Sequence, residues 1–449
     1  MKLKISEIVK ASQGKLLCGD ENTTVTAFST DSRDVKKGTM FVPIKGENVD
    51  SHIYIDNVFE NGAAASFTEE MTTLGKNPVV LVDDNRLALQ KTAAYYRSQF
   101  NIPVIGITGS AGKTSTKEMV AQALSAKFNV LKTAKNQNSQ VGVPITVCGI
   151  KKEHEVAVVE MGISMPGEMA RIAAVVKPNF AIVTNIGVSH IEYLKSRENI
   201  MAEKLHIADY IKSDGIIFVN GDDDLLETLQ KNGKHKIITF GVGANCDCRA
   251  GEFNETEKGT FFSCSFKGEN VQIFVPAFGV HNIRNALVSF AVARTLGVDA
   301  EGAIRAIGAY KTPSRRQEII KAGDIWVIDD SYNASPDSMR GAVEILANHK
   351  AEGKKIAVLA DMLELGDTAE KEHFSIGEFA AENKIDYLVG IGELSKFIVD
   401  GFNGKNSRHF NSNSEAVAYL KEILQAGDTV LVKGSRGMKT DEIVSALTK

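Results

Sequence analysis

The chain has 449 residues, 43% of them hydrophobic, and its 52 lysines and arginines against 56 aspartates and glutamates leave a formal charge of −4. This length predicts about three domains, and the balanced charge gives no reason to expect nucleic acid or an anionic membrane as the main partner. The sequence has no signal-peptide core and no apolar run near the roughly 20 residues that span a bilayer, so we expect a cytoplasmic protein without integral membrane association.

Residues 1–98 are predicted to form a small N-terminal α/β domain. Short segments that alternate apolar and polar residues occur at 25–28 and 40–44, and turns separate them. Such segments indicate short strands.

Residues 99–313 are predicted to form a central domain around a mainly parallel sheet. Apolar strands alternate here with helical segments, which favours helices on both faces of the sheet. A β-hairpin at 261–274 adds antiparallel strands, and two helices follow at about 282–296 and 300–309. The expected parallel strands are 104–107, 156–159, 180–184, 216–219 and 237–240.

A second strand–helix series follows a boundary placed at Thr312-Pro313-Ser314-Arg315-Arg316. Residues 314–449 are therefore predicted to form a C-terminal Rossmann-like domain. Its expected strands are 326–329, 356–360, 387–391 and 429–433. The predicted fold class is α/β, with a central phosphate-loop ATPase domain between the two others.

A glycine-rich loop between a predicted strand and a predicted helix indicates the first ligand. It reads Gly109-Ser110-Ala111-Gly112-Lys113-Thr114-Ser115. Glycines let backbone N–H groups curl around a polyphosphate, Lys113 can meet the β- and γ-phosphates, and the Thr114 hydroxyl can bind Mg²⁺. The pattern T-G-x-x-G-K-T-S departs from the general form, because Ile107 stands where that form has its first glycine. We expect ATP here, with an ordinary strand-to-helix turn as the alternative.

Polar residues follow three of the expected strands, at the edge where open parallel sheets bind their ligands. Glu160 ends the strand at 156–159, Asn185 follows 180–184, and Asp330 follows 326–329. A carboxylate in such a position can hold Mg²⁺ beside a phosphate loop. Without the loop, a solvated acid at a strand end explains Glu160 equally well.

Two further side chains are ambiguous from the sequence. His190 stands in a glycine-containing loop beyond a strand, where a histidine could bind a metal, titrate or only form hydrogen bonds. Lys204 belongs to a helical segment, and most lysines on amphipathic helices are solvated. The sequence alone favours a structural role for His190 and a solvated side chain for Lys204.

The ordered set of motifs resembles the Mur ligase family, ATP-dependent amide-forming ligases that build the peptidoglycan precursor. The resemblance covers nearly the whole chain and is far more specific than any one motif. It is carried by the phosphate loop, Glu160-Met161-Gly162, the stretch Thr184 to His190, Ala202-Glu203-Lys204, the stretch His281 to Ala286, and Ser314-Arg315-Arg316.

Three C-terminal motifs are most similar to the family members that act last and add D-alanyl-D-alanine to UDP-N-acetylmuramoyl-tripeptide (UDP-MurNAc-tripeptide). They are Asp329 to Pro336, Asp361 to Gly366 and Lys433 to Met438. The resemblance implies that ATP phosphorylates the terminal carboxylate of the tripeptide, and that the dipeptide amine then displaces phosphate. It also implies a monomeric enzyme.

The resemblance assigns roles to individual residues. It implies that Lys113 and its loop bind the phosphates and that Thr114 and Glu160 bind one Mg²⁺. It also implies that His190 and a carbamoylated Lys204 bind a second Mg²⁺. Nucleotide contacts are implied for Asn282, Asn285, Arg316 and Asp330. Contacts with the UDP-sugar-peptide substrate or the acceptor are implied for Ser29, Asp31, Ser32, Arg33, Lys45, Gly46, Asn136, Asn138, Tyr332 and Asn333.

Other functions stay open at this point. The related ligase that adds the third amino acid to UDP-MurNAc-dipeptide usually carries an Asp-Asn-Pro-Arg motif when it selects a diamino acid, and this chain has none. Folylpolyglutamate synthase is another acid–amino-acid ligase with the same chemistry. A phosphate-loop switch that hydrolyses nucleotide to drive a partner would leave the first domain, His190 and Lys204 unexplained.

Overall fold

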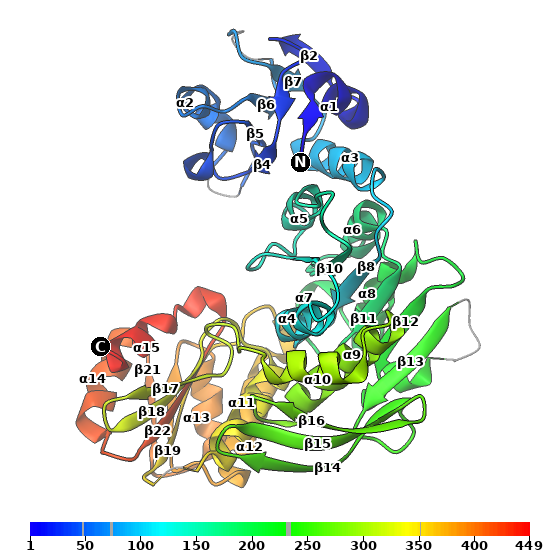
Figure 1. Ribbon diagram of the computed structural model, residues 1–449. Helices are drawn as coiled ribbons and strands as arrows, with labels where there is room; N and C mark the ends of the chain where they lie inside the picture. The colour runs from blue at the N-terminus through cyan, green and yellow to red at the C-terminus, as the bar shows by residue number, and fades with distance from the viewer. Residues whose placement is uncertain (47–48, 72–74, 230–234, 351) are drawn as a thin grey trace.

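The computed structural model describes residues 1–46, 49–71, 75–229, 235–350 and 352–449 and has three lobes, each built on its own main sheet (Figure 1). The N-terminal lobe lies at the top of Figure 1, the central lobe below it, and the C-terminal lobe at the lower left. Among the described helices, none is both long and apolar enough to span a membrane.

The N-terminal lobe contains a five-stranded sheet in the order β2-β7-β6-β5-β4, in which only β2 runs antiparallel to its neighbour. The strand segment expected at 40–44 is confirmed in part as the shorter β5, whereas the segment expected at 25–28 is divided between β3 and β4, which belong to different sheets. The sheet strands are Lys15–Cys18 (β2), Ala27–Ser29 (β4), Thr39–Phe41 (β5), Ala65–Thr68 (β6) and Val79–Leu81 (β7). A two-stranded ribbon pairs Leu3–Lys4 (β1) with Thr24–Val25 (β3), and the helices are Ile5–Ser12 (α1), Ile55–Glu60 (α2) and Asn85–Arg97 (α3).

The central lobe contains a nine-stranded sheet in the order β16-β15-β14-β13-β12-β11-β8-β10-β9. Each pair of neighbouring strands from β14 to β9 in this order is parallel. The pairs β14–β15 and β15–β16 are antiparallel and extend the sheet at its other edge. Its strands are Val104–Thr108 (β8), Val130–Lys132 (β9), Val156–Glu160 (β10), Phe180–Val183 (β11), Ile216–Asn220 (β12), Lys236–Gly241 (β13), Cys248–Thr256 (β14), Gly259–Phe266 (β15) and Glu269–Val275 (β16). Its helices are Lys113–Leu124 (α4), Gly142–Cys148 (α5), Glu168–Val176 (α6), Ile191–Leu194 (α7), Arg197–Leu205 (α8), Val280–Thr295 (α9) and Ala300–Gly308 (α10).

The C-terminal lobe contains a six-stranded sheet in the order β17-β18-β22-β19-β20-β21, in which only β17 is antiparallel to its neighbour. The four strands predicted for this lobe are confirmed. Its strands are Glu318–Ala322 (β17), Ile325–Asp330 (β18), Lys355–Ala360 (β19), Tyr387–Ile391 (β20), Ser407–Phe410 (β21) and Thr429–Lys433 (β22). Its helices are Pro336–Asn348 (α11), Ala369–Glu382 (α12), Ser395–Phe402 (α13), Asn413–Ile423 (α14) and Asp441–Leu447 (α15).

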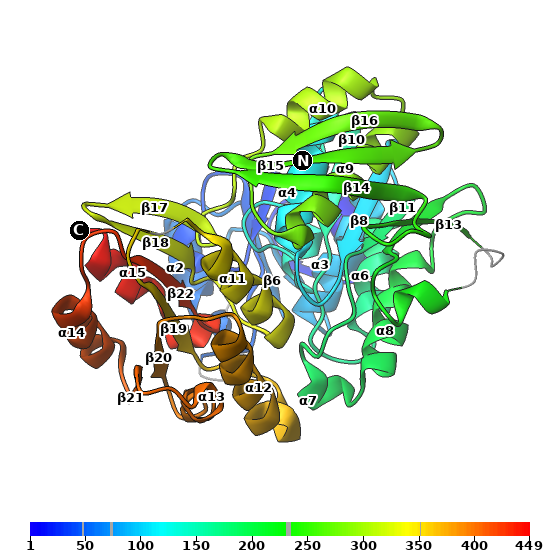
Figure 2. The same cartoon turned by 90° about the horizontal axis from the view of Figure 1, so that it is seen from below.

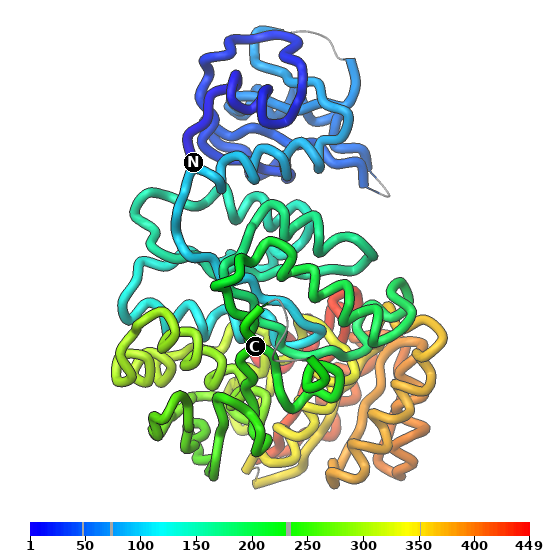
Figure 3. The backbone as a smooth tube through the Cα atoms, turned by 90° about the vertical axis from the view of Figure 1, so that its right-hand side faces the viewer, coloured from blue at the N-terminus to red at the C-terminus, as the bar shows by residue number. Residues whose placement is uncertain are grey.

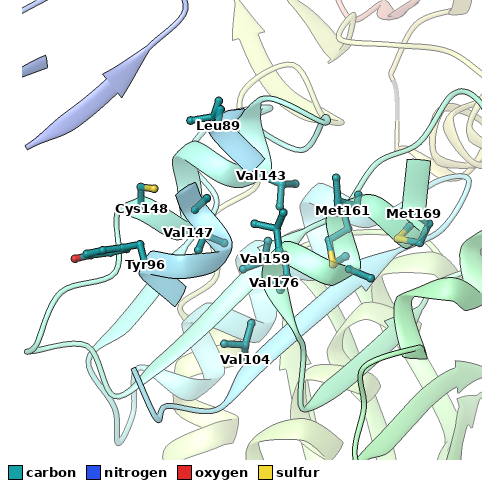
Figure 4. Close-up of a cluster of buried hydrophobic side chains, with 14 of the residues drawn as sticks. Leu89, Tyr96, Val104, Val143, Val147, Cys148, Val159, Met161, Met169 and Val176 are labelled. Carbon is teal, nitrogen blue, oxygen red and sulfur yellow. The ribbon is translucent and has the colours of Figure 1, made fainter. Parts of the chain in front are cut away.

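Helix α3 connects the N-terminal lobe to the central lobe, and Figure 3 shows it lying between the two. Leu89 and Tyr96 on α3 belong to the same buried cluster as Val147 on α5 and Val159 on β10 (Figure 4). The Tyr96 hydroxyl also donates a hydrogen bond of 2.6 Å to the carbonyl of Ile150. The predicted boundary after residue 98 therefore falls just beyond a helix whose packing belongs to both lobes.

The C-terminal lobe meets the central lobe at one side, where Figure 2 shows α12 near α7. Gly366, just before α12, lies against the backbone of Glu192 on α7, because a Cβ atom on that glycine would be only 3.3 Å from Glu192 Cα. This interface brings the ends of strands from two sheets to one cleft.

Candidate active site

The phosphate loop lies between β8 and α4, as the sequence predicts, and leaves no room for larger residues at its start. Gly109 has φ 148°, and a Cβ atom there would lie 1.8 Å from the Thr184 hydroxyl. Neighbouring groups fix the loop, since the N–H of Ala111 donates to Asn185 Oδ1 at 2.8 Å. Helix α4 begins directly after Gly112, so its free N–H groups and positive dipole end lie at the loop.

Lys113 folds back over this loop. Its Nζ donates hydrogen bonds to the carbonyls of Gly109 (2.6 Å) and Ser110 (3.3 Å). Burial lowers the pKa of Lys113 to about 8, the nearby Arg316 acts in the same direction, and the Glu160 carboxylate opposes the shift. The Lys113 amine therefore loses its proton at a lower pH than an exposed lysine does.

Glu160 lies at the end of β10, opposite Ile107 on β8, and is 1% exposed. Its Oε1 accepts hydrogen bonds from the Thr114 hydroxyl (3.1 Å) and from the Asn138 amide (2.7 Å), whereas its buried Oε2 has no hydrogen bond. A carboxylate and a hydroxyl oxygen beside a phosphate loop fit the ligand preference of Mg²⁺.

The donor set around Glu160 is sparse. Among the described residues, no three His, Cys, Asp or Glu side chains gather as a metal cluster.

Lys204 is 1% exposed, so the solvated lysine favoured by the sequence is wrong for this residue. Within the described part of the chain, its Nζ has no hydrogen bond or ion pair. Burial and the proximity of Lys113 lower its pKa well below the ordinary value, and Glu203 opposes the shift only in part. The side chain is therefore a buried amine on which burial and Lys113 disfavour the cation.

His190 lies beside the C-terminal lobe. It precedes α7 with φ 62°, and its Nδ1 lies 2.5 Å from Oε2 of Glu364, which has φ 63°. The interaction with this histidine holds the pKa of Glu364 below its usual range. Left-handed backbone at two non-glycine residues in contact is typical of functional sites.

Residues of the C-terminal lobe and of the segment that leads into it lie across from the phosphate loop. Arg316 donates a hydrogen bond of 3.4 Å to the Thr114 hydroxyl, and its guanidinium lies 4.0 Å from the centre of the Tyr332 ring. Asp330 accepts a hydrogen bond of 2.6 Å from Lys433 Nζ, which also donates to the carbonyl of Asn333 at 2.8 Å. Lys433 thus holds in place both the Asp330 carboxylate and the backbone at Asn333 that follows β18.

A cleft of about 600 Å³ lies between the central and C-terminal lobes. It brings together the loop at 110–114, Asn136, Asn138, Glu160, His190, Arg316, Tyr332, Asn333 and Glu364. A neighbouring cavity of about 300 Å³ is lined by Ser115, Asn285, Arg316, Asp330 and Lys433, and a third of about 350 Å³ by Asn282. Asn282 and Asn285 thus line adjacent cavities that share Ser115 and Arg316, and the Asn285 amide donates a hydrogen bond of 3.2 Å to Asn282 Oδ1.

The six predicted substrate residues of the N-terminal lobe do not line these three cavities. Asp31 and Arg33 form an exposed ion pair of 2.8 Å, and the Ser29 hydroxyl donates to the carbonyl of Asp31 at 2.9 Å. Lys45 pairs with Glu70 at 3.1 Å. Gly46 and Ser32 lie in the same lobe. Their role stays a prediction.

Four residues at the site had no role in the sequence analysis. Lys117, Glu364 and Lys433 have ionisable side chains, and His281 lines the 300 Å³ cavity with its pKa lowered by burial. His281, Glu364 and Lys433 lie inside motifs that resembled the family, which was the only signal for them. Nothing in the local pattern distinguishes Lys117 from a surface lysine.

Comparison with known proteins shows the family. Residues 107–293 match the model of the Mur ligase middle domain, and residues 315–436 match that of the Mur ligase, glutamate ligase domain. A UDP-N-acetylmuramoyl-tripeptide--D-alanyl-D-alanine ligase of Bacillus subtilis is 36% identical over 437 residues, which cover 95% of this chain and 94% of the relative. This chain belongs to the Mur ligase family.

Two solved Mur ligases share its architecture. MurF from Acinetobacter baumannii has a TM-score of 0.92 at 30% identity, covering 100% of this chain and 99% of that one. MurF from Thermotoga maritima, solved in complex with ADP, has a TM-score of 0.84 at 28% identity, covering 94% of this chain and 97% of that one. The predicted family and the three-part α/β fold are confirmed.

Proposed function

We propose that this Mur ligase uses ATP to join D-alanyl-D-alanine to UDP-MurNAc-tripeptide through a new amide bond. The observation that carries the proposal is the shared cleft, where the phosphate loop and Glu160 face the C-terminal segments at 332–338 and 435–437. The name of the Bacillus subtilis relative and the ADP in the Thermotoga maritima structure support this substrate pair and ATP.

The proposed reaction has two steps. The terminal carboxylate of the tripeptide attacks the γ-phosphorus of ATP, and ADP leaves as the acyl phosphate forms. The dipeptide amine then attacks the carbonyl carbon, loses a proton, and inorganic phosphate leaves as the amide forms. Lys113, Arg316 and the N-terminus of α4 offset the negative charge that gathers on the transferred phosphoryl group.

We place the nucleotide along the phosphate loop and the 300 Å³ cavity. Residues Gly109 to Ser115 would bind the phosphates, Asp330 the ribose, and Asn282 and Asn285 the adenine side, because amides can both donate and accept. Asp330 is held in place by Lys433 in the free protein. In the cleft, Asn136, Asn138, Tyr332 and Asn333 would contact the peptide or the acceptor.

Magnesium belongs to the proposal as well. Thr114 and Glu160 would hold one ion, and His190 together with a carbamoylated Lys204 would hold a second. The ions would screen the negative charges of the triphosphate and the carboxylate. The burial of Lys204, which disfavours its cation, supports the carbamate: an unprotonated amine nitrogen can attack CO₂, form an N–C bond and release a proton, leaving an anionic oxygen ligand.

We further propose domain boundaries after residues 98 and 313, with the UDP end of the substrate on Ser29, Asp31, Ser32, Arg33, Lys45 and Gly46. We also propose a cytoplasmic monomer, because a single chain brings the phosphate loop, Glu160 and the C-terminal segments to one cleft.

The closest competing function is the addition of a third amino acid to UDP-MurNAc-dipeptide. The purified protein is incubated with ATP and Mg²⁺, once with UDP-MurNAc-tripeptide and D-alanyl-D-alanine and once with UDP-MurNAc-dipeptide and a diamino acid. We expect mass spectrometry to find only the first pair condensed with loss of water, and Glu160→Gln to give no product. A product from the second pair alone would contradict the proposal.

A further inference from the structure

Lys117 is a buried lysine that the proposed mechanism leaves unused. It lies one turn beyond Lys113 on α4 and is 0% exposed. Its Nζ lies 3.0 Å from Glu118 Oε1 and 3.7 Å from Glu160 Oε2, and it donates a hydrogen bond of 3.4 Å to the carbonyl of Lys135. These contacts fix the cation between α4, the end of β10 and the segment after β9.

The two oxygens of Glu160 consequently face different partners. Oε1 accepts hydrogen bonds from Thr114 and Asn138 on the side of the phosphate loop. Oε2 is buried without a hydrogen bond, and the amine of Lys117 lies beside it as a counter-charge. The carboxylate is thus held with one oxygen toward the loop and the other toward Lys117.

We propose that Lys117 is a positioning residue that keeps Glu160 a one-oxygen ligand and thereby favours Mg²⁺ over Ca²⁺. This inference rests on the proposed Mg²⁺ site at Thr114 and Glu160. Mg²⁺ requires a small octahedral shell, whereas Ca²⁺ accepts more oxygens and often takes both oxygens of a carboxylate. A two-oxygen contact through Glu160 would have to draw Oε2 away from Lys117. The larger ion therefore loses the binding mode that suits it best.

The test measures metal affinity in the ADP complex, where no turnover occurs. The protein saturated with ADP is titrated with Mg²⁺ and, separately, with Ca²⁺ by calorimetry. In Lys117→Met, which keeps the length of the side chain and removes its charge, we expect the ratio of Ca²⁺ to Mg²⁺ affinity to rise about tenfold, the scale of effects from groups that orient metal ligands. A folded Lys117→Met protein with the wild-type ratio would overturn the inference.

Lys132→Met is the matched control. Lys132 is half-exposed and also pairs with Glu118, and it has no contact with Glu160. The ratio should be unchanged in this variant. An equal change of the ratio in Lys132→Met would overturn the inference, since the effect would then come from Glu118 or from net charge.

A double variant covers the case in which Lys117→Met does not fold. Removing the cation alone leaves Glu160 buried and uncompensated, whereas Lys117→Met with Glu160→Gln removes both charges. We expect the double variant to melt at a higher temperature than Lys117→Met. Additive losses, or a double variant that does not fold, would mean that Lys117 acts independently of Glu160 and would overturn the inference.

Glu160→Gln by itself separates the two proposals. An unchanged Mg²⁺ affinity in Glu160→Gln would overturn the metal site and the inference with it. A reduced Mg²⁺ affinity there, together with an unchanged ratio in Lys117→Met, would overturn the inference alone.

Discussion

Lys113 gives the site a pH dependence that an exposed lysine would not have. Burial lowers its pKa to about 8, so the amine is a cation below that value and neutral above it. We expect the affinity for ADP, measured by calorimetry, to fall as the pH rises between about 7 and 9, because an ordinary lysine would keep its charge up to about pH 10. Lys113→Gln should bind ADP weakly at every pH. An affinity for ADP that stays constant over this range in the wild type would contradict the shifted pKa.

Lys204 is the residue at which a structural and a chemical role differ most. If its carbamate holds Mg²⁺, Lys204→Ala should lower turnover by orders of magnitude in a protein that still folds, with a lower melting temperature because the buried side chain leaves a cavity. Added acetate or formate should restore part of the rate as a small planar anion. The exposed Lys212→Ala serves as the control. Wild-type turnover in Lys204→Ala would eliminate the carbamate.

The sequence could indicate some of these residues and not others. Lys113, Thr114 and Glu160 follow from the spacing of a phosphate loop and from a polar residue at a strand end. The burial of Lys204 could not be predicted, because helical periodicity does not show which lysine faces inward. The contact between Glu364 and His190 joins two lobes, and local sequence carries no information about such pairs.

At the scale of elements, the parallel pairing of β18 with β22 places Asp330 opposite Lys433 in the middle of the site. Lys433→Met leaves a buried carboxylate without its cation, which should lower the unfolding free energy of the C-terminal lobe by about 3–5 kcal/mol. Urea unfolding followed by the fluorescence of Trp326, the single tryptophan, reports on β18 itself. Adding Asp330→Asn should recover part of the loss. A loss of unfolding free energy below about 1 kcal/mol in Lys433→Met would show that the pair of Asp330 and Lys433 does not stabilise this lobe.

The strands that sequence analysis missed in the central and C-terminal lobes share a physical cause. The predicted central strands such as β8 and β10 are buried along their whole length and read as apolar runs. By contrast, β9, β17 and β21 lie at sheet edges or next to solvent, and their residues are mostly half-buried or exposed. Strand β14 was missed because most of its residues are exposed. A hydrophobic pattern in the sequence reflects burial, so a partly exposed strand shows only a weak pattern.

At the scale of the whole molecule, the site depends on how the lobes are placed. Arg316 reaches Thr114 and Glu364 reaches His190 across a cleft of about 600 Å³. Lobes joined by such polar contacts usually move relative to one another. We expect small-angle scattering to show a smaller radius of gyration when an ATP analogue and UDP-MurNAc-tripeptide bind together. An unchanged radius would contradict a large hinge motion.

Three α/β parts could be predicted from alternating strands and helices, and the phosphate loop could be assigned to the central one. The placement of the lobes could not, because the contacts that fix it involve few residues far apart in the chain. Helix α3 illustrates this, since its sequence does not show that Leu89 and Tyr96 pack on the central lobe.

The central claim is that ATP is consumed to join two substrates. The most direct measurement is the rate of ADP release by the purified protein with ATP and Mg²⁺ alone, with UDP-MurNAc-tripeptide or D-alanyl-D-alanine added singly, and with both. The proposed ligase should release ADP at a sustained rate only when both are present, because the acyl phosphate needs the dipeptide amine to turn over. Equal ADP release with ATP alone would contradict the account and favour a nucleotide-hydrolysing switch.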